Sequence, residues 1–326
     1  MPKAIVVSEL GGPEVLRWED VADAAPGPGE ARVRQTAVGV NFIDVYFRRG
    51  IYKVPQLPYV PDQEGAGVVE TVGSGVSEVA VGDRVAYAGL QGSYAEVRLA
   101  PAARLVKLPP TIDDKTAAAL MLKGMTAEVL LLRCARVGRG DTVLFHAAAG
   151  GVGSIACQWA KQLGIRVIGT AGGPAKVERA QALGCDAVID YDKEDIVARV
   201  KELTGGAGVN VVFDGVGKRT FDASLACLAT RGMLVLFGQA SGAVPPVEPA
   251  ALARASLYLT RPSFFHYVGA RDELVASATR VFEVVASGAV KIPVGQTYAL
   301  RDAAAAHRDL EGRRTTGSTL LIPQEP

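Results

Sequence analysis

The sequence predicts an α/β protein in which a small antiparallel β-barrel leads into a doubly wound parallel sheet. Short apolar segments, punctuated by glycine and aspartate, follow one another closely over roughly the first 100 residues, a spacing typical of small antiparallel barrels. From about residue 141, near-continuous apolar segments alternate with stretches of helical length. That alternation indicates βαβ units, whose parallel strands are covered by helices on both faces.

The N-terminal part contains six candidate strands separated by turn-forming residues. We place them at 3–10, 14–21, 31–41, 65–73, 83–89 and 93–100. The stretch that follows, "DDKTAAALMLKGMTAEVLLLRCA", is rich in alanine and leucine with helical periodicity. It predicts a helix over 113–135, with Asp113 or Asp114 as its N-cap.

The second part of the chain contains the βαβ pattern. Strands are expected at 142–147, 166–171, 187–191, 209–216 and 233–239, and helices at 152–164, 174–184, 195–205 and 218–232. Residues 256–265 are a candidate sixth strand. Beyond them we expect a helix at 272–288, β-structure at 291–300, a helix at 301–312 and a closing strand at 317–323.

Composition narrows the function classes. A chain of 326 residues suggests two domains, and its 49% hydrophobic content is ample for a packed core. The net charge of +1 argues against a nucleic-acid binder held by bulk electrostatics. We see no secretory signal and no apolar run near the ~20 residues that cross a bilayer, so we expect a soluble cytoplasmic protein. The four cysteines and three histidines lack metal-ligand spacing, so no metal site is expected.

The most informative short stretch is "HAAAGGVG", residues 146–153, which joins the first strand of a βαβ unit to its helix. A helix N-terminus presents unpaired N–H groups and a partial positive charge, so a pyrophosphate can sit there when no Cβ blocks its approach. Gly150 and Gly151 leave that space open, and Gly153 lets the helix pack close to the strand. Ala148 replaces the first glycine of the usual pattern. A glycine-rich turn that binds nothing is the alternative interpretation.

The end of the second strand indicates which dinucleotide is bound. NAD-binding domains carry an acidic residue there for the ribose 2′-hydroxyl, but "VIGTAGGPAK", residues 167–176, contains none. Lys176 opens the next helix instead, and a lysine pairs with the 2′-phosphate that a carboxylate would repel. Tyr191, after the third strand, is a candidate for the same pocket. The pattern favours NADPH, although Lys176 alone also fits a solvated helix residue.

Several segments together resemble a known family: "GVNFIDVYFRRGIY", "EGAGVVETVG", "HAAAGGVGSIACQWAKQLG", "FGQASGAV" and "GSTLLIP". The chain resembles the zinc-free quinone oxidoreductases, the zeta-crystallin branch of the medium-chain dehydrogenase/reductase superfamily. This resemblance implies a GroES-like catalytic domain from residues 1–123 and 269–326, with a Rossmann domain inserted at 124–268. It also implies a homodimer that pairs Rossmann edge strands, near residues 232–239 and 256–263.

The resemblance further implies a reaction without metal. Zinc-dependent relatives place cysteines near the positions of Asn41 and Lys123 and a histidine at the position of Gln63. With an amide at two of these positions and an ammonium at the third, zinc lacks its usual ligands. We therefore expect NADPH to reduce a quinone in a metal-free cleft between the domains, where side-chain donors stabilise the charge that develops on the quinone oxygens.

The family resemblance also assigns site residues. The expected catalytic residues are Asn41, Tyr46, Tyr52, Gln63 and Thr126. The expected cofactor contacts are Phe42, Asp44, Gly150, Gly151, Val152, Gly153, Gly172, Gly173, Lys176, Tyr191, Val216, Phe237, Gly238, Ser263, Phe264 and Arg313. Arg314 is an alternative to Arg313, and Glu64 is expected to have a structural role in the barrel. For Asn41, Tyr46 and Tyr52, ordinary packing is the competing interpretation.

Two other functions stay open from the sequence. Zinc-free relatives of this kind also reduce activated carbon–carbon double bonds in enones and enoyl thioesters. Some zeta-crystallin relatives are structural lens proteins or bind RNA. The low net charge and the lack of a basic, aromatic-rich segment give no positive support for RNA binding.

Overall fold

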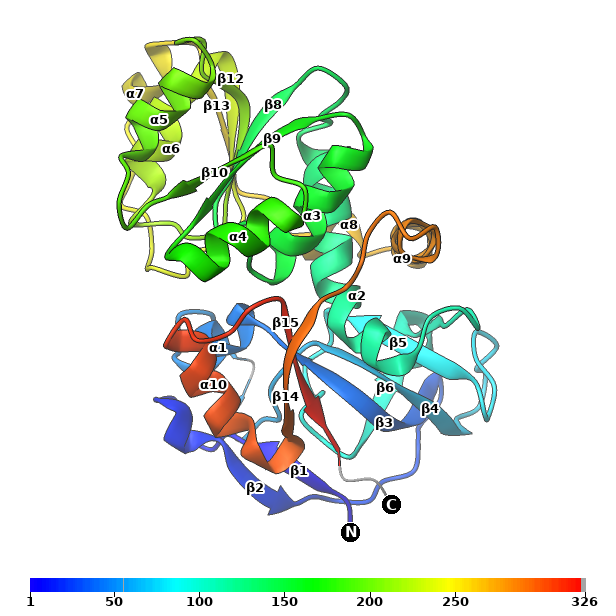
Figure 1. Cartoon of the computed structure of the whole chain (residues 1–326). Helices are drawn as coiled ribbons and strands as arrows, with labels where there is room; N and C mark the ends of the chain where they lie inside the picture. Colours follow the sequence, from blue (N-terminus) through cyan, green and yellow to red (C-terminus); the bar gives the residue numbers. More distant parts are fainter. Residues whose placement is uncertain (55, 324–326) are drawn as a thin grey trace. The chain divides into compact units, whose positions relative to one another are not determined.

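The chain forms two compact units in a computed structural model that describes residues 1–54 and 56–323 (Figure 1). The first unit is built from Met1–Met125, Val268–Ala286 and the chain from Ile292 onward. The second unit comprises Thr126–Tyr267 and Ser287–Lys291. Residues 287–291 thus group with the second unit, whereas the expected division assigned them to the first domain.

A seven-stranded, mainly antiparallel sheet forms the centre of the first unit. Its order is β14-β15-β3-β4-β5-β7, with β6 paired to β3. The strands are β3 (Glu30–Val40), β4 (Glu64–Val72), β5 (Arg84–Ala88), β6 (Val97–Pro101), β7 (Val106–Lys107), β14 (Val294–Ala299) and β15 (Ser318–Ile322). β15 pairs antiparallel with β3, so the C-terminal segment completes a sheet that the N-terminal part begins. A separate pair joins β1 (Lys3–Val6) and β2 (Arg17–Asp20).

Four α-helices accompany this sheet: α1 (Phe42–Arg48), α2 (Asp114–Glu128), α9 (Arg271–Ala286) and α10 (Ala303–Glu311). Three short 3₁₀ turns lie at Pro13–Val15, Ala102–Arg104 and Leu300–Asp302. Asp113 caps α2, since its carboxylate accepts the N–H of Thr116 at 2.9 Å. A π-helical segment, Val129–Cys134, continues α2, so the long helix predicted over 113–135 is present with a change of winding near its end.

The second unit is an all-parallel six-stranded sheet in the order β10-β9-β8-β11-β12-β13. Its strands are β8 (Thr142–Phe145), β9 (Arg166–Ala171), β10 (Ala187–Asp190), β11 (Val209–Asp214), β12 (Leu228–Leu236) and β13 (Tyr258–Thr260). Helices α3 (Gly151–Gln162) and α4 (Pro174–Ala182) pack on one face, and α5 (Ile196–Leu203) and α6 (Phe221–Ala226) on the other (Figure 1). Two one-turn helices, α7 (Ala250–Ala253) and α8 (Phe264–Tyr267), flank β13.

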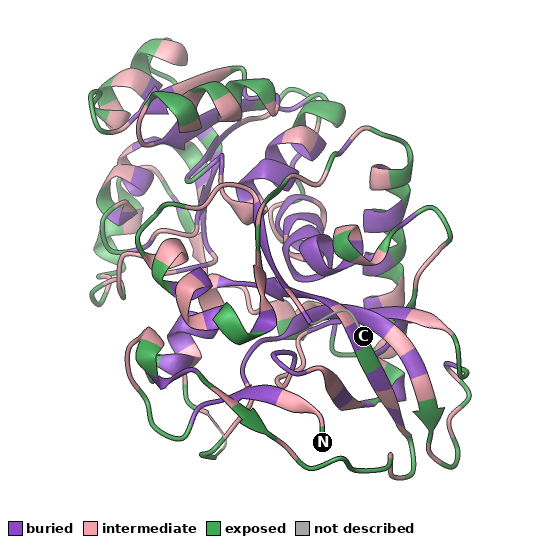
Figure 2. Cartoon of the chain, turned by 60° about the horizontal axis from the view of Figure 1, so that its bottom comes forward, coloured by how far each residue is buried: buried purple, intermediate pink, exposed green. Residues whose placement is uncertain are grey.

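Burial follows this layering, as the purple central strands in Figure 2 show. Leu144, Ile168, Val212 and Leu234 come from four neighbouring strands and are fully buried in one core cluster. Strands covered on both faces need near-continuous apolar sequence, which is why the sequence pattern identified them. Within the described part of the chain, no helix is both long and apolar enough to cross a membrane.

The predicted helix over 218–232 is wrong in its second half. α6 ends at Ala226 and β12 already begins at Leu228. Leu228 pairs with Val209 of β11, and the register then shifts, so that Val211 pairs with Met233. Pairing with a neighbouring strand therefore overrides the local helical preference of this segment. The candidate sixth strand over 256–265 is likewise shorter, because only Tyr258–Thr260 pair with β12.

Candidate cofactor and substrate site

The glycine-rich stretch forms a tight turn between β8 and α3. Ala147 has a left-handed backbone (φ +56°), and Gly150 donates its N–H to the carbonyl of Ala147 at 2.9 Å. A Cβ on Gly153 would lie 2.4 Å from that carbonyl oxygen, so only glycine fits where the helix meets the turn. The first bond of α3 is donated by Ser154 to Gly150 at 2.8 Å. The N–H groups of residues 151–153 precede it and point out of the helix end.

The ends of β9 and β10 bring the next group of predicted residues together. A Cβ on Gly172 would lie 2.6 Å from the Tyr191 hydroxyl, so this ring packs directly against the glycine. Gly173 (φ +81°) is the N-cap of α4, and Lys176 lies in the first turn of that helix. Asp190, which sequence reasoning missed, accepts the N–H of Gly173 at 3.0 Å. Its position at the end of the third strand was the only available signal.

A third group lies beyond β11 and β12. The N–H of Phe237 donates to the carbonyl of Asp214 at 2.9 Å. A Cβ on Gly238 would lie 2.6 Å from the carbonyl oxygen of Gly215, so the two turns are in close contact. Val216 lies in the same turn as Gly215, and its N–H donates to the Asp214 carboxylate at 2.8 Å.

The last predicted contacts of the second unit lie outside these three turns. Ser263 and Phe264 follow β13, where Phe264 begins α8. Thr126 lies in α2, at the start of the second unit.

In the first unit, a buried polar cluster forms around Glu64, which begins β4. One carboxylate oxygen of Glu64 accepts the Asn41 side-chain amide at 2.9 Å and the Lys123 ammonium at 2.6 Å. The other oxygen accepts the N–H of Leu122 at 2.7 Å. Gln63 is buried beside Glu64, and its Oε1 has no hydrogen-bond partner among the described residues. Glu64 thus fixes the amide of Asn41, a residue that the sequence assigned to the site.

Two further buried carboxyl groups lie against this cluster. Asp44 accepts the backbone N–H of Asn41 at 2.7 Å, at the start of α1. Burial raises the pKa of Asp44 to about 7, against the opposing effect of that hydrogen bond. Burial, together with the negative charges of Asp44 and Glu64, raises the pKa of Asp62 well above its usual value. The carboxyl groups of Asp44 and Asp62 therefore retain protons at pH values where exposed aspartates are ionised.

Aromatic side chains cluster on α1 and the segment after it. The rings of Tyr46 and Tyr52 meet edge to face with centroids 5.2 Å apart, and Phe42 lies 5.9 Å from Tyr46. The N–H of Tyr52 also donates to the carbonyl of Tyr46 at 3.1 Å. The structure therefore places Phe42, Tyr46 and Tyr52 next to one another, as a set of flat apolar faces with phenol groups.

The two C-terminal arginines differ in their contacts. Arg313 follows α10 in the first unit with a left-handed backbone (φ +58°). Arg314 donates to Asp309 at 2.6 and 2.8 Å, forming an ion pair close along the chain.

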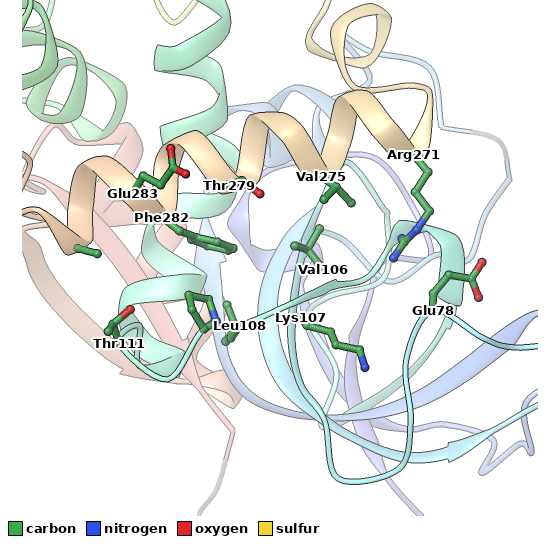
Figure 3. A pocket seen from close by; sticks show the side chains of 12 residues that line it. Glu78, Val106, Lys107, Leu108, Thr111, Arg271, Val275, Thr279, Phe282 and Glu283 are labelled. Carbon is green, nitrogen blue, oxygen red and sulfur yellow. The ribbon is translucent and has the colours of Figure 1, made fainter.

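A separate groove lies between α9 and the chain around β7 in the first unit (Figure 3). Charged side chains of both signs line it, namely Glu78, Glu283, Lys107 and Arg271, together with apolar side chains such as Phe282 and Val275. None of the predicted site residues lines this groove.

The residues of the Glu64 cluster do not fit a zinc ion. Zinc in proteins is bound by thiolate, imidazole and carboxylate groups. Lys123 has a positive charge and no lone pair when it is protonated, and it already occupies the Glu64 carboxylate. Across residues 1–54 and 56–323, no group of three or more histidine, cysteine, aspartate or glutamate side chains could hold a metal ion.

The fold and these strand-end turns define a two-domain dehydrogenase/reductase. The model of the alcohol dehydrogenase GroES-like domain matches residues 27–110, and the model named zinc-binding dehydrogenase matches residues 151–282. The chain belongs to the medium-chain dehydrogenase/reductase superfamily, in its quinone oxidoreductase branch. The predicted fold class and family are confirmed.

Relatives of known name match over the full length. A quinone oxidoreductase of Pseudomonas aeruginosa is 49% identical, with 99% of this chain and 100% of the relative covered. A 2-haloacrylate reductase of Burkholderia sp. is 45% identical at the same coverage. Among solved structures, the Escherichia coli quinone oxidoreductase complexed with NADPH has a TM-score of 0.96 and 46% identity, covering 98% of this chain and 100% of that one.

Proposed function

We propose that this protein is an NADPH-dependent quinone reductase that works without a metal ion. The observation that carries the proposal is the meeting of three turns at the carboxyl ends of parallel strands, where open α/β sheets bind dinucleotides. These are the glycine-rich turn, the Gly172–Gly173 turn and the Gly215–Gly217 turn. The similarity to a quinone oxidoreductase that was crystallised with NADPH supports the choice of cofactor and substrate.

Bound NADPH supplies the hydride, and the second unit supplies the means to bind it. The N–H groups of Gly151, Val152 and Gly153 and the dipole of α3 favour a pyrophosphate, with Gly150 leaving the approach open. Lys176 and Tyr191 are suited to a 2′-phosphate, since α4 has no acidic residue in its first turn.

The remaining proposed contacts extend the cofactor site. On the second unit they are Val216, Phe237, Gly238, Ser263 and Phe264, and on the first unit Phe42, Asp44 and Arg313.

The first unit supplies the proposed substrate contacts, to which Thr126 of α2 is added. Tyr46 and Tyr52 offer aromatic faces for a quinone ring and hydroxyl groups for its oxygens. Donors held in place before the reaction stabilise the charge that hydride transfer puts on those oxygens. The buried Gln63 amide, with Oε1 unsatisfied within the described chain, is a further polar contact. Asn41 is held by Glu64, so its amide is fixed in orientation before a ligand binds.

A second candidate function is the reduction of an activated carbon–carbon double bond. The 45% identity to a 2-haloacrylate reductase favours it, because the same hydride donor serves both acceptors. NADPH oxidation should be followed with an ortho-quinone, an enone, a haloacrylate and an enoyl thioester, with EPR to detect any radical product. We expect the quinone to give the largest kcat/KM. Turnover with the alkenes alone would replace the proposal, and no turnover with any acceptor would remove both candidates.

We also propose a cytoplasmic homodimer that pairs the β13 edges of two copies. β13 is the terminal strand of its sheet in the described chain, and Tyr258 on it is more than half exposed. An edge strand presents backbone groups that a second strand can pair with. Light scattering on the purified protein should give twice the mass of one chain, and a single-chain mass would contradict the proposal.

A further inference from the structure

A buried chain of hydrogen bonds lies beneath the proposed cofactor site, with His146 near its middle. This histidine is the first residue after β8, and its backbone N–H donates to the carbonyl of Phe213 on the neighbouring β11 at 3.0 Å. Its Nδ1 lies 3.0 Å from the Thr170 hydroxyl of β9, and its Nε2 lies 2.9 Å from the Ser224 hydroxyl of α6. The side chains of His146, Thr170 and Ser224 are all almost fully buried.

The chain ends on the carboxylate of Asp214, the last residue of β11. Asp214 Oδ2 lies 2.7 Å from the Ser224 hydroxyl, and Oδ1 accepts the N–H groups of Val216 and Gly217 at 2.8 and 3.0 Å. Thr220 donates its hydroxyl to the same carboxylate at 2.7 Å. So many donors around one buried carboxyl group match its ionised form, which only accepts hydrogen bonds.

These contacts determine which nitrogen of His146 carries the proton. Ser224 has a single hydroxyl hydrogen, and the Asp214 carboxylate accepts it. The Ser224 oxygen must then accept from His146, so Nε2 bears hydrogen and Nδ1 accepts from the Thr170 hydroxyl. Burial lowers the pKa of His146, although Asp214 opposes that shift, and a neutral ring is the state this assignment requires. Every bond from Thr170 to Asp214 is therefore donated in one direction.

The position of this chain in the fold gives it a role. β8 and β11 are the central pair of the sheet, and the strand order reverses between them. From β8 the chain continues to β9 and β10 on one side, and from β11 it continues to β12 and β13 on the other. Ligands of open α/β sheets bind outside the carboxyl ends at this point. The residue after His146 begins the glycine-rich turn, and Asp214 holds the turn that contains Val216. The hydrogen-bond chain thus joins the two turns on either side of the proposed cofactor site.

We infer that His146 is a positioning residue for the dinucleotide, which acts through Ser224 and Asp214 to hold both turns in their binding geometry before NADPH arrives. This inference deepens the proposed function and rests on it. When the turns of a site are ordered before the ligand binds, binding carries no entropic cost for ordering them, and the affinity is higher. Breaking this hydrogen-bond chain should therefore weaken NADPH binding. If His146 only stabilised the fold, the same substitutions would lower Tm and leave the affinity for NADPH nearly unchanged.

The test uses Ser224→Ala and His146→Asn, each of which removes the bond between His146 and Ser224. Thr204→Val is the control, because its hydroxyl also accepts and donates hydrogen bonds, here partly buried ones, in the second unit at the end of α5. α5 ends at the opposite, amino-terminal edge of the sheet. We expect the first two variants to raise the calorimetric Kd for NADPH about tenfold, equivalent to about 1.4 kcal/mol. Thr204→Val should lower Tm but keep Kd within about twofold of wild type.

Wild-type affinity in a folded Ser224→Ala variant, or an equal loss in Thr204→Val, would overturn the inference. If the variants do not fold, NMR of wild-type protein with ¹⁵N-labelled histidine gives an independent test. A proton on Nε2 of His146 supports the inference, and a proton on Nδ1 overturns it. If wild-type protein itself binds no NADPH, the proposed function fails, and the NMR result still decides the direction of the hydrogen-bond chain.

Discussion

Replacing Asp44 with asparagine should change how the stability of the fold depends on pH. Burial holds the pKa of Asp44 at about 7 in the folded protein, against 3.8 for an ordinary aspartate. As the pH rises above about 4, the unfolded chain loses this proton first, so ionisation favours the unfolded state. The free energy of unfolding therefore falls by about 1.4 kcal/mol per pH unit from about pH 4 until the pH passes 7. The total loss is about 4 kcal/mol.

Asp44→Asn removes this titration and keeps a side-chain oxygen that can accept the N–H of Asn41. We therefore expect the free energy of unfolding of the variant, relative to wild type, to rise by about 4 kcal/mol between pH 4 and pH 8. Urea unfolding followed by circular dichroism at half-unit pH intervals measures this difference. Asp20→Asn is the control, since the Asp20 side chain is 55% exposed and forms an ion pair with the half-exposed Lys3. A difference between Asp44→Asn and wild type that is independent of pH would refute the reasoning.

Two further substitutions test the cofactor and the polar cluster. Lys176→Ala should raise the KM for NADPH at least tenfold, since a hydrogen bond to a charged group contributes about 1.5–3 kcal/mol. The KM for NADH should stay nearly unchanged. Equal losses with both cofactors would contradict the 2′-phosphate assignment. Lys123→Met should lower the free energy of unfolding by roughly 3–5 kcal/mol, because it leaves the buried Glu64 carboxylate without its cation. In the double variant Lys123→Met, Glu64→Gln, urea unfolding should show that part of the lost free energy of unfolding is restored. A Lys123→Met protein as stable as wild type would show that the ion pair does not stabilise the fold.

The βαβ part of the fold could be predicted because its signal is local. Each strand of the second unit is a short apolar run, and glycine or proline marks where most helices begin or end. α1 could not be predicted in this way, because it has only seven residues, several of them aromatic or β-branched. Tertiary contacts hold it, since Arg48 at its end is fully buried and donates to His307 and Glu311 of α10. Those partners are about 260 positions away along the chain.

In the candidate site, too, the residues with a local sequence signal could be predicted and those that depend on distant contacts could not. The glycines at 150 and 153 could be predicted from the sequence itself, because a Cβ at either position would crowd the carbonyl oxygen of Ala147. Gly172 and Gly173 came from the family resemblance; the first packs against the Tyr191 ring and the second has a left-handed backbone. The partners of the buried carboxylates could not, because Glu64, Asp190 and Asp214 each meet groups from other strands or helices. Sequence reasoning set Glu64 aside as structural, and the structure shows that it fixes the amide of Asn41.

The Glu64 cluster bears on the difference from zinc-dependent relatives that the family resemblance implies at Asn41, Gln63 and Lys123. Asn41 and Lys123 both donate to one oxygen of Glu64, so the carboxylate is satisfied by an amide and an ammonium. Replacing Lys123 alone with a cysteine would leave Glu64 buried without a cation, a loss of several kcal/mol. One thiolate beside a carboxylate and two amides would still fall short of a tetrahedral zinc site. The step from Lys123 to cysteine therefore costs stability before any metal can bind, and this cost favours retention of the lysine with its Glu64 partner.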